Sequence, residues 1–222
     1  MGIQFKSGVS NVMKTKAVAD VVFCFDCTGS MDSVIENVKN NVNRFVEGLN
    51  ADQSVIIDWR MRAVGYGDLE CGEEMQNSND FVSTVPEFQK QVAGIRMCGG
   101  GDEPESTLDA ILVAAKTSKW RRAHKIIVVF TDAHTKNLHP STSKKFAVNT
   151  FEEFKQSLAD DHIKLFLWGA NDEKYSGLKL LPNAEINEMD KPHETLSSGA
   201  DMRSLLELMG KTVSSFAGSE VL

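Results

Sequence analysis

The order of apolar segments predicts an α/β fold: a doubly wound, mostly parallel central sheet with helices on both faces. Two continuous apolar runs, residues 19–26 (ADVVFCFD) and 124–132 (HKIIVVFTD), end in aspartate and are typical of strands buried on both faces. Between and after them lie segments whose apolar residues recur at helical spacing. Because strands alternate with helices, the chain is expected to form βαβ units and hence a parallel sheet.

The first strand leads directly into a helix from Asp32 to Leu49, where seven apolar residues trace one face. Three further strands are predicted besides the two apolar runs: one over 55–66, a short antiparallel edge strand over 80–84, and one over 164–169. The predicted helices open at Pro86 and lie over 105–118, around 151–158 and, at the end, from Met202 to Phe216. The stretch from 170 to about Ser198 is predicted to be less regular.

The 222 residues show no internal repeat, low-complexity linker or break in composition. A length in this range is enough for one domain with a substantial core. We therefore expect a single domain over residues 19–218, preceded by an extension over 1–18 and followed by a tail over 219–222. We expect the chain to be a monomer when alone.

The net charge is −7, from 24 Lys and Arg against 31 Asp and Glu, and no basic block is present. This balance argues against nucleic acid and anionic membrane surfaces as partners and favours metal cations. The first twenty residues are polar and contain no apolar stretch of the kind found in secretory signals. We therefore expect a cytoplasmic protein whose four cysteines remain reduced.

Cys24 and Cys27 form a C-x-x-C pattern, but it occurs at the end of the predicted strand over 19–26. Residues three apart on a strand point to opposite faces, and no second C-x-x-C is present to complete a zinc site. These cysteines are therefore interpreted as small buried apolar residues rather than redox or zinc groups.

Oxygen-bearing side chains follow the two buried strands. Asp26, Thr28 and Ser30 close the first strand, Asp132 closes the second, and a glycine-rich loop between them carries Asp102. In an open α/β sheet the ligand site lies at the carboxyl ends of the strands, so these residues are expected to meet at one edge. Carboxylate and hydroxyl oxygens suit Mg²⁺ or Mn²⁺ better than zinc.

Residues 26–30 (DCTGS) resemble the D-x-[ST]-G-S motif of von Willebrand factor type A (VWA) domains, which opens their metal-ion-dependent adhesion site (MIDAS). The GYGD turn at 65–68, the GGGDEPES loop at 99–106 and the FTDA strand end at 130–133 occur in the same order as in that family. The chain looks closest to the intracellular and microbial branch with a GGGD-x-PE second loop. The resemblance implies a Rossmann-like α/β domain.

The resemblance also implies a role for each residue of the site. Thr28 and Ser30 would ligate a divalent ion, Mg²⁺ or else Mn²⁺ or Ca²⁺, directly through their hydroxyls. Asp26 and Asp132 would act largely through coordinated waters and by orienting those hydroxyls. Asp102 occupies the position where adhesive members usually have threonine.

The aspartate at position 102 changes the expected charge around the ion. With Glu103 and Glu105 beside it, three or more carboxylates would surround the metal. We expect tighter retention of the metal, and weaker attraction for an acidic side chain of a partner.

These features predict a non-catalytic module that binds a protein partner through the metal; an acidic side chain of the partner is one group that could complete the shell. Two alternatives remain open. One is a metal-dependent phosphohydrolase or phosphotransferase with Asp26 as nucleophile, although Thr28 stands where such enzymes carry a second aspartate. The other is a scaffold whose site holds no metal. The sequence does not identify the partner.

Overall fold

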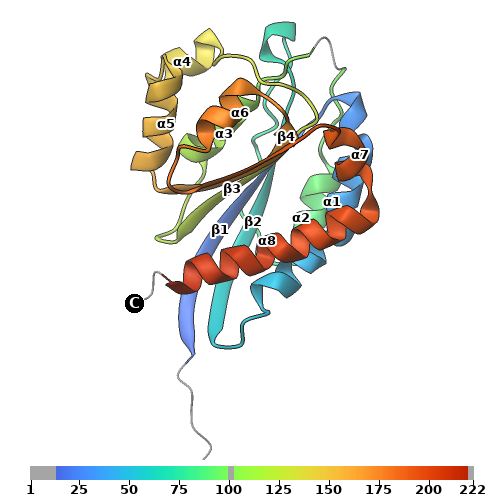
Figure 1. The fold of residues 1–222 in the computed structure, drawn as a ribbon, viewed down its shortest axis with the longest axis vertical. Coiled ribbons are helices and arrows are strands. Elements are labelled where there is room, and N and C mark those ends of the chain that lie inside the picture. The colour runs from blue at the N-terminus through green and yellow to red at the C-terminus, as the bar shows by residue number, and fades with distance from the viewer. Residues whose placement is uncertain (1–13, 100–102, 220–222) are drawn as a thin grey trace, which may run out of the picture.

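A computed structural model describes residues 14–99 and 103–219. Its five strands are all parallel, in the order β2-β1-β3-β4-β5, with helices on both faces (Figure 1), which confirms the predicted fold class. The strands are β1 (Thr15–Asp26), β2 (Val55–Tyr66), β3 (His124–Phe130), β4 (Ile163–Ala170) and β5 (Ala184–Met189). The helices are α1 (Asp32–Leu49), α2 (Val85–Ala93), α3 (Thr107–Thr117), α4 (Pro140–Phe146), α5 (Phe151–Asp160), α6 (Glu173–Leu178), α7 (Pro192–Ser197) and α8 (Gly199–Ser219).

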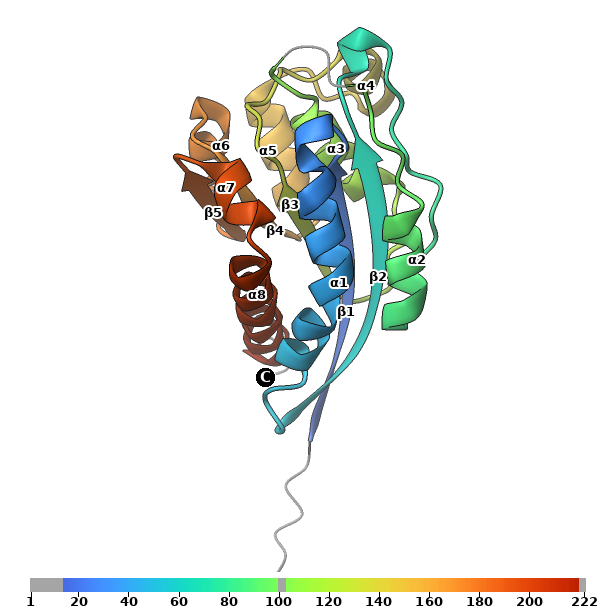
Figure 2. The same cartoon turned by 90° about the vertical axis from the view of Figure 1, so that its right-hand side faces the viewer.

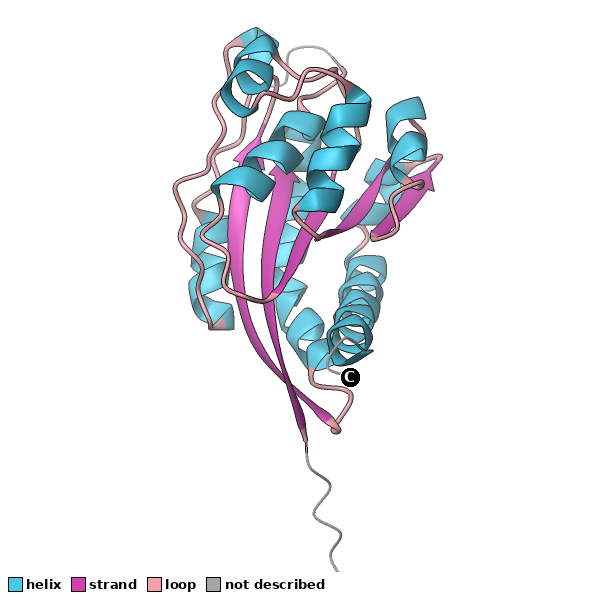
Figure 3. Cartoon of the chain, turned by 90° about the vertical axis from the view of Figure 1, so that its left-hand side faces the viewer, coloured by secondary structure: helices cyan, strands magenta, loops and turns pink. Residues whose placement is uncertain are grey.

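The sheet separates two apolar layers, because successive side chains of each strand point to opposite faces. On β1, Phe23 and Phe25 pack into the layer under α1, α2, α7 and α8, whereas Val22 and Cys24 pack into the layer under α3, α5 and α6. All four side chains are fully buried. Figures 2 and 3 show the helices on the two sides of the sheet. The continuous apolar run of this strand therefore reflects burial on both faces.

Three predictions about the elements require correction. The predicted edge strand over 80–84 is reduced to one antiparallel bridge, between Met61 and Val82 beside β2. The first strand begins at Thr15, four residues earlier than predicted. The stretch predicted as irregular contains α6, β5 and α7. Both helices have six residues, too few to show a helical period, and all six residues of β5 are half-buried, so no apolar run marks it.

Along the parts of the chain that the structure describes, no helix combines the length and the apolar character needed to cross a bilayer.

Helices α1 and α8 cross in close backbone contact at a pair of glycines. A Cβ atom on Gly210 would lie 2.2 Å from the carbonyl oxygen of Phe45 and 2.9 Å from the backbone nitrogen of Leu49. A Cβ atom on Gly48 would lie 2.4 Å from the carbonyl oxygen of Glu207. Since the obstructing atoms are backbone, a side chain here would force the two helices apart.

We expect Gly210→Ala to destabilise the fold by about 1–3 kcal/mol, the usual cost of inserting a methyl group into a filled interface. Urea denaturation followed by circular dichroism measures the change. Gly199→Ala on the same helix is the control, because the added Cβ would meet its nearest neighbour, Oδ1 of Asn37, at an ordinary 3.4 Å. Equal stability of the two variants would contradict the close-contact argument.

The buried carboxylate of Asp20 forms ion pairs with two arginines and so links β1 to β2 and to the loop before β3. The fully buried carboxylate of Asp20 accepts hydrogen bonds from Arg60 (Nε, 2.8 Å; Nη2, 2.7 Å) and from Arg121 (backbone N, 2.7 Å; Nε, 2.8 Å). Burial alone would raise the pKa of this carboxyl, but the two arginines outweigh it and hold the pKa below its ordinary value.

Because the pKa of Asp20 is lower in the folded than in the unfolded chain, its ionisation stabilises the fold above the unfolded pKa of about 4. That contribution is lost as the pH falls through the folded pKa. We expect Asp20→Asn to cost about 2 kcal/mol at pH 7, less than a fully buried pair because both arginines are partly exposed. The difference from the parent should shrink below pH 4, which denaturant titrations at several pH values would show. A difference independent of pH would contradict the ionic origin.

Candidate functional site

The carboxylate of Asp26 ends β1 at the point where the strand order reverses, between β1 and β3. It is fully buried and three donors hold it. Oδ1 accepts from the backbone nitrogen of Thr28 at 3.0 Å and from its Oγ1 at 2.8 Å, and Oδ2 accepts from Oγ1 of Thr131 at 2.8 Å. The orientation of Asp26 is therefore fixed by the first loop and by the end of β3 together.

Two hydroxyls of the first loop lie next to this carboxylate. Oγ1 of Thr28 and Oγ of Ser30 are 3.4 Å apart, with Thr28 nearly buried and Ser30 exposed. Ser30 belongs to a short 3-10 turn, Gly29–Met31, that leads into α1, and the buried side chain of Met31 anchors the turn in the core. The loop thus presents the Ser30 hydroxyl to the solvent, next to the buried hydroxyl of Thr28.

Asp132 follows β3 and its side chain is 11% exposed. Nδ1 of His193, near the start of α7, lies 3.4 Å from Oδ2 of Asp132. No motif or spacing in the sequence singles out His193. Pro192 before it is a helix-start signal, but the contact with Asp132 depends on how α7 folds back over the strand ends.

Asp102 lies outside the described residues, so its position relative to the other predicted residues stays a prediction. The two glutamates that follow it are described. Oε1 of Glu103 accepts from the backbone nitrogen of His134 at 3.0 Å and contacts the His134 ring, which keeps the pKa of Glu103 below its usual range. Glu105 is 3% exposed, and its Oε2 has no hydrogen-bond partner.

Burial and mutual repulsion raise the pKa values of two of these carboxyls. The pKa of Asp26 is raised to about 6 by burial, with a contribution from the charge of Asp132, against the lowering effect of its three hydrogen bonds. The pKa of Glu105 is raised to about 8 by burial and by the charges of Asp26, Asp68 and Glu73. This edge of the sheet is therefore an acidic environment in which a cation would be stabilised.

The available donors match a hard divalent ion. Among residues 14–99 and 103–219, no three His, Cys, Asp or Glu side chains are grouped so that they could hold a metal by themselves. The structure instead brings together two hydroxyls, of Thr28 and Ser30, with the carboxylates of Asp26 and Asp132 nearby. Such a set fits an ion with oxygen ligands and retained water, as Mg²⁺ prefers.

The cysteines and the remaining loop histidines have other surroundings. Cys24 packs in the core, and the buried Sγ of Cys27 accepts a hydrogen bond from Gln76 at 3.6 Å. No disulfide links cysteines of the described chain. His134 contacts Glu103, and Nδ1 of His139 accepts from the backbone nitrogen of Ser141 at 3.3 Å. The full burial of Cys24 and Cys27 agrees with their interpretation as small buried apolar residues.

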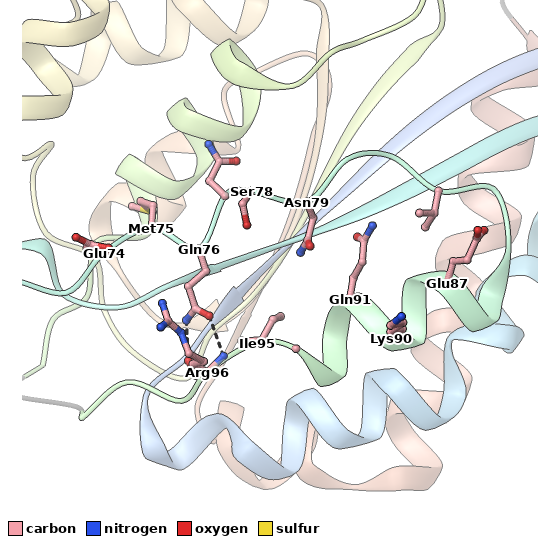
Figure 4. A pocket seen from close by; sticks show the side chains of 13 residues that line it. Glu74, Met75, Gln76, Ser78, Asn79, Glu87, Lys90, Gln91, Ile95 and Arg96 are labelled. Atoms are coloured by element: carbon pink, nitrogen blue, oxygen red, sulfur yellow. Dashed lines mark hydrogen bonds between the residues drawn. The ribbon is translucent and has the colours of Figure 1, made fainter.

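A pocket of about 840 Å³ lies between α2 and the segment 74–82 (Figure 4). None of Asp26, Thr28, Ser30 and Asp132 lines it. Three of its amide side chains form hydrogen bonds with the backbone. Gln91 accepts from the nitrogen of Ala63 at 3.0 Å, Asn79 donates to the oxygen of Ala63 at 3.0 Å, and Gln76 makes two hydrogen bonds with the backbone of Arg96. The polar lining thus completes the edge of β2, where a paired strand was expected.

Curated relatives match part of the sequence. The chain is 29% identical over 122 residues to the alpha-protein kinase vwkA of Dictyostelium discoideum, covering 54% of this chain and 19% of that protein. It is 29% identical over 140 residues to hemicentin-2 of Mus musculus, covering 63% of this chain and 2% of that protein. The chain therefore spans a small part of each relative.

Solved structures share the fold at low identity. A von Willebrand factor type A protein from Catenulispora acidiphila has a TM-score of 0.54 and 16% identity, covering 87% of this chain and 42% of that one. Proximal thread matrix protein 1 from the mussel byssus, with a zinc-occupied MIDAS motif, has a TM-score of 0.58 and 13% identity, covering 91% of this chain and 47% of that one.

The sequence pattern of the von Willebrand factor A domain family matches residues 20–157, which include the second half of β1, all of β2 and β3, and the loops that follow these strands. The resemblance predicted from residues 26–30 and from the order of the other loops is thereby confirmed. The chain belongs to the von Willebrand factor A domain family.

Proposed function

We propose that this chain is a non-catalytic module that binds a protein partner through a divalent ion at the carboxyl edge of the sheet. The observation that carries the proposal is the arrangement of the first loop. Asp26 is locked by three hydrogen bonds, and the hydroxyls of Thr28 and Ser30 lie beside it with Asp132 close enough to influence its charge. The ion would supply a positive charge at this edge and a coordination position for a partner's oxygen atom.

Each described residue of the proposed site has a separate task. Thr28 and Ser30 offer hydroxyl oxygens from one turn, and the core anchor Met31 keeps that turn in place. Asp26 orients Thr28 by accepting a hydrogen bond from its hydroxyl, and it adds negative charge to the site. Asp132 adds a second carboxylate from the neighbouring strand end. Exposure of Ser30 leaves the outer side of the site accessible to a partner.

Mg²⁺ is the ion we propose, with Mn²⁺ and Ca²⁺ as alternatives, because the described donors are oxygens. The mussel byssus protein, which shares the fold, is described with zinc in its MIDAS motif, so a divalent ion can occupy such a motif on this fold. The nitrogen of His193 near Asp132 is the one described feature of the site that would suit zinc.

A catalytic role for Asp26 has little support. The residue is fully buried, with its two carboxylate oxygens facing Thr28 and Thr131, so a substrate phosphorus atom has no open approach to either oxygen. Thr28 cannot act as a general acid. One relative is a protein kinase, but this chain corresponds to 19% of that protein. The alternative is a scaffold that holds no metal. Measuring whether the chain binds Mg²⁺ distinguishes it from the proposed module.

We expect millimolar Mg²⁺ to raise the thermal unfolding midpoint of the parent protein, by about 5 °C or more at a hundredfold excess over Kd. Ser30→Ala removes one ligand from an exposed position, so it should leave the midpoint in EDTA unchanged and reduce the Mg²⁺ shift. Differential scanning fluorimetry measures both values. Ser204→Ala, an exposed serine on α8, is the matched control and should respond to Mg²⁺ as the parent does. Absence of a shift with Mg²⁺, Mn²⁺ and Ca²⁺ in the parent would favour the scaffold.

We expect partner capture to depend on the ion. The tagged chain is incubated with an extract of its source cells in Mg²⁺ or in EDTA, and retained proteins are quantified by mass spectrometry. A partner of this site should be retained in Mg²⁺ by the parent and by Ser204→Ala, and lost in EDTA and with Ser30→Ala. A partner retained equally under all four conditions would contradict recognition through the metal.

A further inference from the structure

The carboxyl of Glu105 lies in surroundings that the fold alone does not explain. The residue is 3% exposed, and Oε2 is buried without a hydrogen-bond partner. An unpartnered buried carboxyl is costly, and native proteins tolerate few of them. Glu105 precedes α3, whose N-cap residue Ser106 makes no side-chain cap, and the backbone nitrogen of Leu108 in the first turn donates instead to Oγ1 of Thr135 at 3.3 Å. Glu105 therefore does not cap this helix.

The backbone of Glu105 is fixed by the loop that also carries Asp132. Its nitrogen donates to the carbonyl oxygen of His134 at 2.9 Å, and its carbonyl oxygen accepts from the nitrogen of Lys136 at 2.9 Å. The next two residues bind the loop after β2: Oγ of Ser106 accepts from Leu69, and Oγ1 of Thr107 contacts the hydroxyl of Tyr66. Glu105 is therefore held where the loops after β2 and β3 meet.

The charges around Glu105 are unbalanced. Asp26, Asp68 and Glu73 all act on it with negative charge. Lys136 acts with positive charge, but its Nζ donates to Asp68 at 2.7 Å and to Glu70 at 2.8 Å. This ammonium group is thus already engaged, and a further cation would be needed to ionise Glu105 in this environment.

We propose that Glu105 is an additional residue of the metal site, whose carboxylate accepts a hydrogen bond from the water shell of the divalent ion. This inference rests on the proposed function. A role through water agrees with the observation that no three acidic, His or Cys groups of the described chain are placed to ligate one ion directly. A water molecule of the shell would donate a hydrogen bond to the buried Oε2, and the charge of the ion would offset the repulsion between Glu105 and Asp26.

Isothermal titration of Mg²⁺ at one fixed pH tests the inference on the parent chain and on Glu105→Gln. The amide has the same shape but no charge, so the Kd for Mg²⁺ should rise tenfold or more, as is usual for outer partners of metal sites. In EDTA, the thermal midpoint of Glu105→Gln should equal or exceed that of the parent, because a buried unpartnered acid has been removed.

Asp109→Asn is the matched control. Asp109 lies on α3, is fully buried, and has an Oδ2 without a hydrogen-bond partner, while Oδ1 accepts from the backbone nitrogen of His139 at 3.0 Å. It therefore reproduces the buried acid of Glu105 without the influence of Asp26. The control should bind Mg²⁺ as the parent does, so that loss of binding with Glu105→Gln alone supports the inference.

A Kd for Glu105→Gln within twofold of the parent value overturns the inference and leaves the proposed function standing. A parent that binds none of Mg²⁺, Mn²⁺ and Ca²⁺ overturns both. Should Glu105→Gln fail to fold in EDTA, Glu105→Asp takes its place. That variant keeps the charge but withdraws the carboxylate by one methylene, so a parental Kd in Glu105→Asp overturns the inference and a raised Kd supports it.

Discussion

The hydrogen bonds that hold the carboxylate of Asp26 are the constraint on which the edge of the sheet depends. An ionisable group without solvent contact must be satisfied by the protein, and here Thr28 and Thr131 provide the donors. These donors come from the loop after β1 and from the end of β3, the two strands between which the chain changes direction across the sheet. Satisfying Asp26 therefore fixes the first loop, and with it the turn that presents Ser30.

Elements with a long apolar pattern were predictable from the sequence, and short or half-polar ones were not. The run that ends at Asp26 and the helix that begins at Asp32 have enough apolar residues to reveal their period. β5 has the sequence AEINEM and is half-buried throughout, so neither a continuous nor an alternating pattern stands out. Its place in the sheet is decided by backbone pairing with β4, which the residue types do not express.

The candidate site likewise contains residues that could be predicted from the sequence and residues that could not. Asp26, Thr28 and Ser30 follow one strand, so their proximity could be predicted from local spacing and the motif. The sequence placed Glu105 among acids but could not show that its Oε2 is buried and unpartnered, because that depends on loops after β2 and β3. The approach of His193 to Asp132 likewise depends on α7 returning to the strand ends. Residues joined only by tertiary structure give no local signal.

The proposed role of Glu105 changes the chemistry expected of a partner. Two positive charges of the ion would face three carboxylates, those of Asp26, Asp132 and Glu105, which leaves the site negative rather than positive. The chain as a whole also has a net charge of −7. An acidic side chain approaching this edge would then be opposed by both the local and the overall field. A neutral oxygen donor, with basic residues around it on the partner surface, fits such a site better than the carboxylate that hydroxyl-dominated sites of this kind would attract.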